Sequence, residues 1–175
     1  MARIPPASDT GEIAERIRQR RPGGVLRPID EVLLHTPEIA GGWNSLLGSI
    51  RRGAGLPADL RELVILRIAV LNDAPYEWES HEAEARAAGL RPDQLAALRG
   101  SRPADAAVFS TAQRSALRLA DAMTREIGVP DELFGDLRAL FGPPELVELV
   151  VVVAAYNMVS RLVVALGVRS REETP

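Results

Sequence analysis

The 175-residue chain contains no cysteine and no lysine, and each absence excludes a class of chemistry. Without a thiol there is no disulfide, no thiolate catalysis and no zinc–thiolate site. Without lysine there is no side-chain amine to form a Schiff base. The two histidines, His35 and His81, leave little for a histidine-based metal site. We therefore expect neither a metal nor a cofactor, and we interpret His35 as a structural or exposed residue.

Charge and hydropathy exclude two further classes of partner. The net charge is −3 and the isoelectric point is about 5.5, so nothing indicates a nucleic-acid-binding surface. The N-terminal residues lack the apolar core of a signal peptide. The longest uninterrupted apolar run, Leu149–Tyr156, is much shorter than the ~20 residues of a membrane span. We expect a soluble cytoplasmic protein that binds neither nucleic acid nor membrane.

The pattern predicts an all-α fold of about eight helices, because Gly and Pro fall at plausible helix ends and no Asn-Gly or Asp-Gly hairpin turn occurs. Thr36-Pro37 resembles an N-cap with proline at the first helical position, and Asp30 is a possible N-cap of a shorter helix. Gly89 is the expected residue just after a helix end. The predicted helices cover residues 12–21, 30–35, 37–50, 57–72, 75–88, 92–98, 104–127, 130–141 and 144–166.

The candidate catalytic residues lie between positions 56 and 90. Glu77 and His81 are four residues apart, so both side chains project from one helix face. A carboxylate beside an imidazole orients the ring and raises its basicity, which is a workable acid–base pair. Glu62 reaches the same place if helices 57–72 and 75–88 form an antiparallel hairpin. On spacing alone, such a pair is more often a solvated surface pair.

The sequence of this segment, LPADLRELVILRIAVLNDAPYEWESHEAEARAAGL, resembles the core of the carboxymuconolactone decarboxylase / alkylhydroperoxidase D superfamily. In the alkylhydroperoxidase D branch the core is a glutamate followed by Cys-x-x-Cys-x-x-x-His, with a tyrosine before the second cysteine. Counted back from His81, the cysteine positions hold Ala74 and Glu77. Tyr76 falls on the tyrosine position, and Glu62 matches the relay glutamate.

Two further segments extend the resemblance to roughly residues 25–168. HTPEIAGGWNSLLGSIR is similar to the family's upstream helix, and YNMVSRLVVALGV is similar to its C-terminal helix. The resemblance implies an alkylhydroperoxidase D-like helical bundle that assembles as a homo-oligomer, a trimer or hexamer. We expect an N-terminal arm with a short helix at 1–24, a carboxymuconolactone decarboxylase-like domain at 25–168 and a disordered tail at 169–175.

The missing cysteines decide which activities the resemblance can imply. A peroxide-reducing thiolate and a disulfide relay are excluded. The decarboxylase branch does not need those thiols, and a histidine in this region is thought to serve its acid–base chemistry. The first hypothesis is therefore a cofactor-independent lyase or isomerase that acts on a small lactone, carbonyl or carboxylate. The alternative is a non-catalytic oligomeric protein that retains the pocket as a ligand binder or scaffold.

Each candidate site residue has a predicted role. His81 is the proton-transfer group, Glu77 or Glu62 assists it, and Tyr76 holds the developing oxyanion. Arg67 is either a carboxylate anchor or a buried ion-pair partner of Glu62 or Glu77. The candidate substrate-binding residues are Trp43, Arg67, Trp78 and Asn157. For both tryptophans, core or interface packing is the competing interpretation, and for Tyr156 and Asn157 we favour a helix interface over a pocket.

Overall fold

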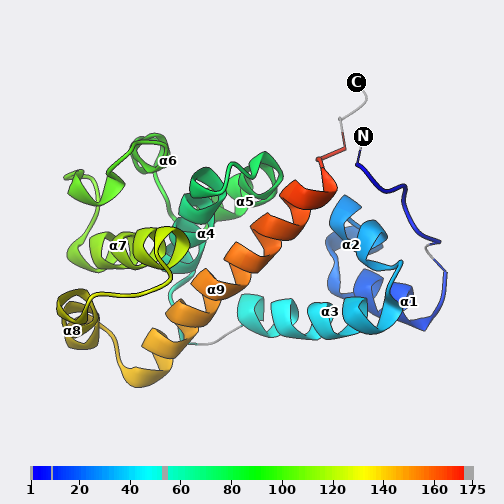
Figure 1. Cartoon of the computed structure of the whole chain (residues 1–175), viewed down its shortest axis with the longest axis horizontal. Coiled ribbons are helices and arrows are strands. Elements are labelled where there is room, and N and C mark those ends of the chain that lie inside the picture. Colours follow the sequence, from blue (N-terminus) through cyan, green and yellow to red (C-terminus); the bar gives the residue numbers. More distant parts are fainter. Residues whose placement is uncertain (1, 9, 53–54, 172–175) are drawn as a thin grey trace. The chain divides into compact units, whose positions relative to one another are not determined.

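The computed structural model describes residues 2–8, 10–52 and 55–171, and these residues form nine α-helices and two short 3-10 turns (Figure 1). The predicted all-α class is confirmed. The helices are α1 (Glu12–Arg20), α2 (Pro28–Leu33), α3 (Pro37–Arg52), α4 (Ala58–Leu71), α5 (Pro75–Ala87), α6 (Pro92–Leu98), α7 (Thr111–Arg125), α8 (Asp131–Leu140) and α9 (Pro143–Leu166), and the 3-10 turns are Pro22–Gly24 and Pro103–Asp105.

The chain divides into two compact units. Unit 1 comprises residues 1–53 together with 163–175, and unit 2 comprises residues 54–162. The predicted boundary after residue 24 falls within unit 1 and stays a prediction. The last four residues of the predicted tail at 169–175 lie outside the described residues. Every residue of the predicted acid–base site belongs to unit 2.

Unit 1 is built on α1 and α3, which pack against each other, and Ile17 of α1 and Leu47 of α3 are buried. Arg21 binds Asp30 through two hydrogen bonds of 2.7 and 2.8 Å, and both side chains are buried. The expectation that Asp30 is an N-cap was wrong. The helix begins two residues earlier, at Pro28, and Asp30 lies in its first turn, where the carboxylate accepts a hydrogen bond from the backbone N–H of Arg27.

Unit 2 is centred on the hairpin of α4 and α5. Helix α4 is buried on nearly all sides because α5 and α7 both pack against it. A tight turn at Asn72–Ala74 reverses the chain, and proline at the first position of α5 starts the next helix. Gly89 closes α5 with φ of +102°, the left-handed conformation expected after a helix end. The hairpin therefore agrees with the sequence prediction to within a residue at each end.

Helix α7 is shorter than predicted at both ends. Ser110 caps the helix: its side-chain oxygen accepts a hydrogen bond from the backbone N–H of Gln113, and the side-chain oxygen of Gln113 accepts one from the backbone N–H of Ser110. This reciprocal capping box fixes the start at Thr111, and the segment before it holds the 3-10 turn rather than a helix. At the other end the helix stops at Arg125, and Ile127 has φ of +67°.

Helix α9 is the longest described helix and the most apolar. By length and composition alone it would suffice to cross a membrane, but half of its most apolar stretch is buried within the protein. Leu149, Val153 and Tyr156 point inward, whereas Val147 and Val151 remain exposed. Helix α9 is therefore a half-buried core helix, as its polar interruptions indicated.

Candidate active site

Glu62 and His81 form a buried pair across the α4–α5 hairpin. The Nδ1 atom of His81 lies 2.7 Å from a carboxylate oxygen of Glu62, a hydrogen-bond distance. Glu62 is 5% exposed and His81 is 2% exposed. Glu62 is in the first half of α4 and His81 is in the middle of α5, so the antiparallel hairpin brings them together. The structure thus joins two of the four predicted catalytic residues directly.

The charge state of Glu62 follows from these surroundings. Burial acts to raise its pKa, because removal from water penalises the charged form. The hydrogen bond from His81, the charge of His81 and the neighbouring Arg61 act in the opposite direction and outweigh burial. Arg61 Nε donates to the second carboxylate oxygen at 3.2 Å. The pKa of Glu62 is therefore lowered, and the carboxylate is charged at neutral pH.

Glu77 faces the opposite edge of the same imidazole. Its carboxylate lies 3.9 Å from Nε2 of His81, within ion-pair range but beyond a hydrogen bond. Glu77 is 3% exposed, which excludes the solvated surface pair that spacing alone favoured. His81 therefore lies between two buried carboxylates, with Glu62 at hydrogen-bond distance from Nδ1 and Glu77 farther away, on the side of Nε2.

Two tyrosines belong to the surroundings of this pair. The ring of Tyr156, on α9, meets the His81 ring edge to face, with centroids 5.1 Å apart and an interplanar angle of 87°. Such contact fixes the plane of the imidazole. Tyr76 is buried in the first turn of α5, next to Glu77 in the sequence. Its predicted oxyanion-holding role stays a prediction.

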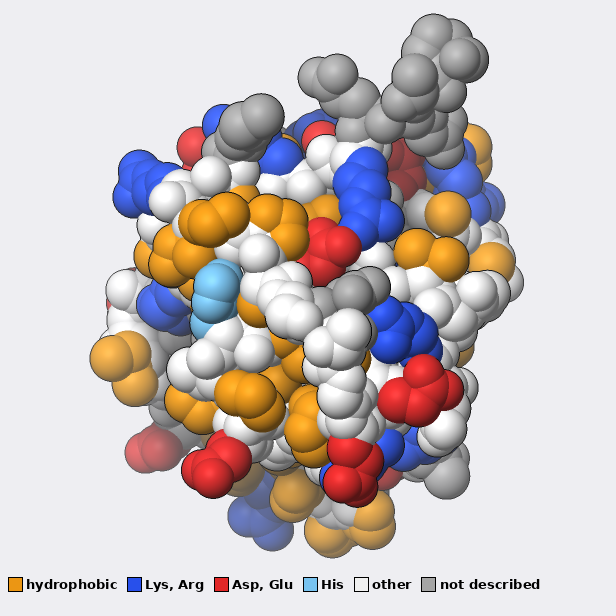
Figure 2. Space-filling model, turned by 90° about the vertical axis from the view of Figure 1, so that its right-hand side faces the viewer, with side chains coloured by type: hydrophobic (Ala, Val, Ile, Leu, Met, Phe, Trp, Pro, Cys, Tyr) orange, Lys and Arg blue, Asp and Glu red, His pale blue; other side chains and the backbone are white. Residues whose placement is uncertain are grey.

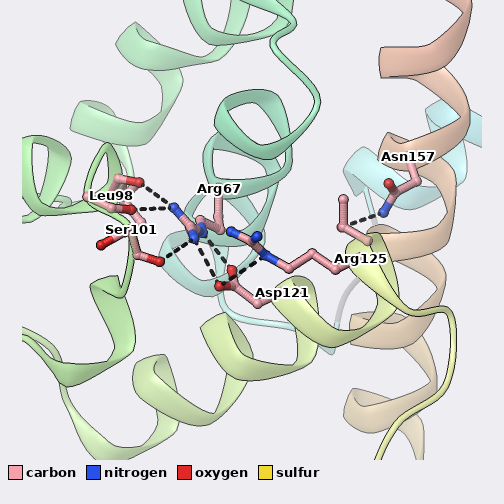
Figure 3. A network of polar contacts seen from close by, with 8 residues as sticks. Arg67, Leu98, Ser101, Asp121, Arg125 and Asn157 are labelled. Carbon is pink, nitrogen blue, oxygen red and sulfur yellow. Dashed lines mark hydrogen bonds and ion pairs between the residues drawn. The ribbon is translucent and has the colours of Figure 1, made fainter.

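Arg67 lies apart from this pair, and its guanidinium is occupied by protein groups (Figure 3). It binds both carboxylate oxygens of Asp121 at 2.6 and 2.9 Å. It also donates to the backbone carbonyls of Leu98, Gly100 and Ser101. The sequence suggested an ion pair with Glu62 or Glu77, and the structure corrects this: the partner is Asp121 on α7. A role as substrate anchor has no support in these contacts.

Trp78 and Asn157 are also engaged by protein groups. Trp78 Nε1 donates to Glu82 at 2.8 Å, and the Arg99 guanidinium lies 3.7 Å from the indole centroid. Asn157 accepts from Asn72 and donates to Thr124 Oγ1, which joins α4, α7 and α9. The helix-interface role that we favoured for Asn157 agrees with these contacts, and both substrate-binding roles stay predictions.

Trp43 lies on α3 in unit 1 and is partly exposed, whereas the other candidate site residues belong to unit 2. Its role in substrate binding stays a prediction. In the described part of the chain, no group of three His, Asp or Glu side chains is arranged to hold a metal ion.

Comparison with known proteins gives the family. Residues 37–122 match the carboxymuconolactone decarboxylase family. The uncharacterized protein YdfG of Bacillus subtilis (strain 168) is 27% identical over 112 residues, which are 63% of this chain and 75% of YdfG. An Agrobacterium tumefaciens protein of unknown function, linked to the antioxidant defence protein AhpD, is 26% identical with a TM-score of 0.74, covering 81% of this chain and 97% of that one. The AhpD-core, peroxidase-related protein of Ralstonia eutropha JMP134 is 20% identical and has a TM-score of 0.80. The match covers 98% of this chain and 93% of that protein.

The chain belongs to the carboxymuconolactone decarboxylase family and has its AhpD-like fold. Within this family the present member lacks any cysteine, so it has no thiolate of its own to reduce a peroxide. The two positions that the resemblance assigns to thiols, Ala74 and Glu77, lie at the start of α5. A carboxylate therefore faces His81 from the position of the second thiol.

Sequence reasoning missed two residues of this family member's site. For Tyr156 we favoured a helix interface over a pocket, yet its ring packs against His81. Arg61, which supports the charge of Glu62, was not considered. The position of Arg61 beside Glu62 was a usable signal. The contact of Tyr156 joins residues far apart in the sequence, and nothing local indicates it.

Proposed function

We propose that this protein is a cofactor-independent acid–base enzyme that acts on a small lactone, carbonyl or carboxylate substrate. One observation carries the proposal: a buried histidine holds a charged carboxylate on Nδ1 and faces a second carboxylate from Nε2. The Glu62 carboxylate keeps the proton on Nδ1, so Nε2 is the nitrogen that exchanges a proton. Burial strengthens each of these interactions because water does not screen them.

A decarboxylation shows how these groups would act. The C–C bond to the substrate carboxylate breaks, CO2 leaves, and its electron pair becomes an enolate on the remaining fragment. Protonated His81 then transfers its Nε2 proton to carbon, while Glu62 stabilises the imidazolium. An isomerisation uses the same nitrogen first as base and then as acid. Glu77 is placed to exchange the proton with Nε2 between turnovers.

The test is deuterium incorporation and CO2 release with a panel of γ-carboxylated lactones and β-keto acids, followed by NMR in D2O. His81→Gln is expected to lower turnover by at least about 100-fold, because proton transfer by a positioned side chain contributes that much. His35→Gln is the matched control, since His35 is the other histidine and is exposed. Turnover that survives in His81→Gln would refute the proposal.

The second candidate is a non-catalytic ligand-binding or scaffold protein, and the depth of burial favours it. None of the residues Glu62, Glu77 and His81 is more than 5% exposed, so a substrate reaches them only if the surrounding helices separate. In this case no member of the substrate panel exchanges deuterium or releases CO2. His81→Gln would then change stability alone.

A further inference from the structure

A cluster of arginines surrounds Gly48 in unit 1. Arg20 is the last residue of α1, and Arg51 and Arg52 end α3. A Cβ atom on Gly48 would lie 3.2 Å from Nη2 of Arg52 and 3.3 Å from Cδ of Arg20. Both side chains thus pass close to the same point of α3, and a Cβ atom there would require them to shift by a few tenths of an ångström. We call Arg20 and Arg52 the Arg20 cluster.

The Arg20 cluster contains more positive than negative charge. Arg20 Nε donates to the side-chain oxygen of Asn44, a neutral acceptor. The nearby carboxylate of Asp30 is buried and already holds Arg21 with two hydrogen bonds. In residues 2–8, 10–52 and 55–171, no carboxylate lies within ion-pair distance of Arg20 or Arg52.

The electrostatic cost of this arrangement appears on Arg20. Burial, and then the charges of Arg21 and Arg51, lower its pKa to about 10, and the charge of Asp30 offsets only part of the effect. A half-buried guanidinium without a carboxylate partner is less favourable than one that binds an anion. The cluster thus has the charge and the partial enclosure of an anion-binding site.

We propose that the Arg20 cluster binds a phosphate-type oxyanion, either inorganic phosphate or the phosphoryl group of a small metabolite. The planar guanidinium presents paired N–H donors that match the spacing of phosphate oxygens. Arg20 and Arg52 approach the same point from different helices, so one tetrahedral anion can accept hydrogen bonds from both. Asn44, one helical turn before Gly48, holds Arg20 in place.

The surroundings favour a small anion over a polyanion. Nucleic acids and acidic membranes need an extended basic surface. Figure 2 shows one face of the molecule on which acidic, basic and hydrophobic side chains are interspersed, with no continuous basic area. The net charge of the chain is −3, which opposes long-range attraction of a polyanion. The basic cluster is local and fits a single oxyanion.

Isothermal titration of the full chain with inorganic phosphate, at constant ionic strength set by sodium chloride, tests the proposal. We expect saturable binding and a thermal midpoint that rises with phosphate concentration. Arg20→Gln is expected to raise Kd at least about tenfold, because a charged hydrogen bond is lost. Arg138→Gln, at an exposed arginine of α8 in unit 2, is the matched control and should leave Kd unchanged.

A second variant keeps the test decisive if Arg20→Gln is poorly folded. Gly48→Ala suits a helix better than glycine, but its methyl group would lie 3.3 Å from Cδ of Arg20 and 3.2 Å from Nη2 of Arg52, so these side chains must shift. It should therefore weaken phosphate binding without loss of folding. Ribose 5-phosphate in place of inorganic phosphate distinguishes the two sources: tighter binding indicates a phosphorylated metabolite, and equal or weaker binding indicates free phosphate.

Three outcomes would overturn the inference. The first is that phosphate shows no saturable binding, and the second is that chloride at equal ionic strength binds in the same way. The third is that Arg20→Gln and Gly48→Ala both still bind phosphate. Arg20-dependent binding of acidic phospholipid vesicles without phosphate binding would also reject it in favour of a membrane surface. The proposal is independent of the acid–base site, which belongs to unit 2, so His81→Gln should retain phosphate binding.

Discussion

Glu62 is a carboxylate that is kept charged in a place where burial opposes charge. An unpaired buried carboxylate would take up a proton, because transfer out of water costs several kcal/mol. The hydrogen bond from His81 and the neighbouring Arg61 reverse that tendency and lower the pKa of Glu62. The imidazole is in turn oriented by the carboxylate and by the ring of Tyr156. Three helices thus define the position of one ring.

This lowered pKa predicts how stability depends on pH. A carboxylate whose pKa is lower in the folded than in the unfolded state stabilises the fold above its usual value of 4.5. That contribution is lost as the pH falls through the folded-state pKa. Glu62→Gln should therefore lower the free energy of unfolding by about 2 kcal/mol near neutral pH, and by progressively less below pH 4.5.

Urea unfolding of the wild type and Glu62→Gln at several pH values between neutral and 3 measures this difference. Glu132→Gln, at an exposed carboxylate in the first turn of α8, is the control and should change stability little at any pH. A difference for Glu62→Gln that stays constant or widens in acid would contradict the assignment.

At the scale of elements, Arg67 joins three parts of unit 2. Its guanidinium links α4 to α7 through Asp121 and binds three backbone carbonyls at the end of α6 and in the turn that follows (Figure 3). Arg67→Met should lower the free energy of unfolding by about 3 kcal/mol, because it leaves a carboxylate and buried carbonyls without a donor. Chemical denaturation measures the loss.

Arg125 provides the matched control for Arg67. It approaches the same carboxylate, Asp121, at 4.0 Å, but its side chain is 55% exposed. Arg125→Met should therefore change stability by less than about 1 kcal/mol. Equal losses from the two substitutions would show that the buried carbonyl contacts of Arg67 contribute nothing.

The end of α7 contains a conformation that the sequence does not favour. Ile127 has φ of +67°, a left-handed conformation that costs a β-branched residue about 1–2 kcal/mol. Its side chain is 85% exposed, so its removal loses little packing. Ile127→Gly should raise the free energy of unfolding by about 1 kcal/mol and the thermal midpoint by about 2–4 °C.

A glycine introduced at an ordinary helical position is the control for Ile127→Gly. Ala139 is exposed within α8, so Ala139→Gly should lower stability by about 1 kcal/mol through the poor helix propensity of glycine. A loss of stability in Ile127→Gly as well would show that the left-handed conformation is not the limiting feature at this helix end.

Local signals account for what the sequence predicted. Proline and glycine at helix ends predicted the α4–α5 hairpin, and the family motif then indicated that Glu62 and His81 meet. The predicted start of α7 was wrong because the prediction overlooked the capping box of Ser110 and Gln113. The predicted ion-pair partner of Arg67 was wrong because Asp121 is brought to Arg67 by the packing of α7 on α4 and not by local spacing. Helix boundaries are local, whereas ion-pair partners depend on tertiary packing.

At the scale of the whole molecule, α9 leaves a regular apolar stripe uncovered. Its exposed residues follow alternating spacings of four and three, which is the seam spacing of paired helices. The stripe, which we call the α9 stripe, comprises Val147, Val151, Ala154 and Met158, and Arg161 continues the spacing. Val147 alone is 62% exposed. A stripe of this kind is suited to another helix, and the expected homo-oligomer supplies one.

We propose that the α9 stripe pairs with the same stripe of a second copy. An antiparallel pair centred on Ala154 uses the same residues on both copies, which makes the contact self-complementary. Light scattering at micromolar concentration should give a mass above that of the 18.9 kDa monomer. Ala154→Arg should lower the measured mass toward that of the monomer, because it places two positive charges where the two copies of α9 come closest. Arg118→Ala, at an exposed site on α7, should leave it intact. A clean wild-type monomer, or an Ala154→Arg assembly of unchanged mass, would exclude this interface.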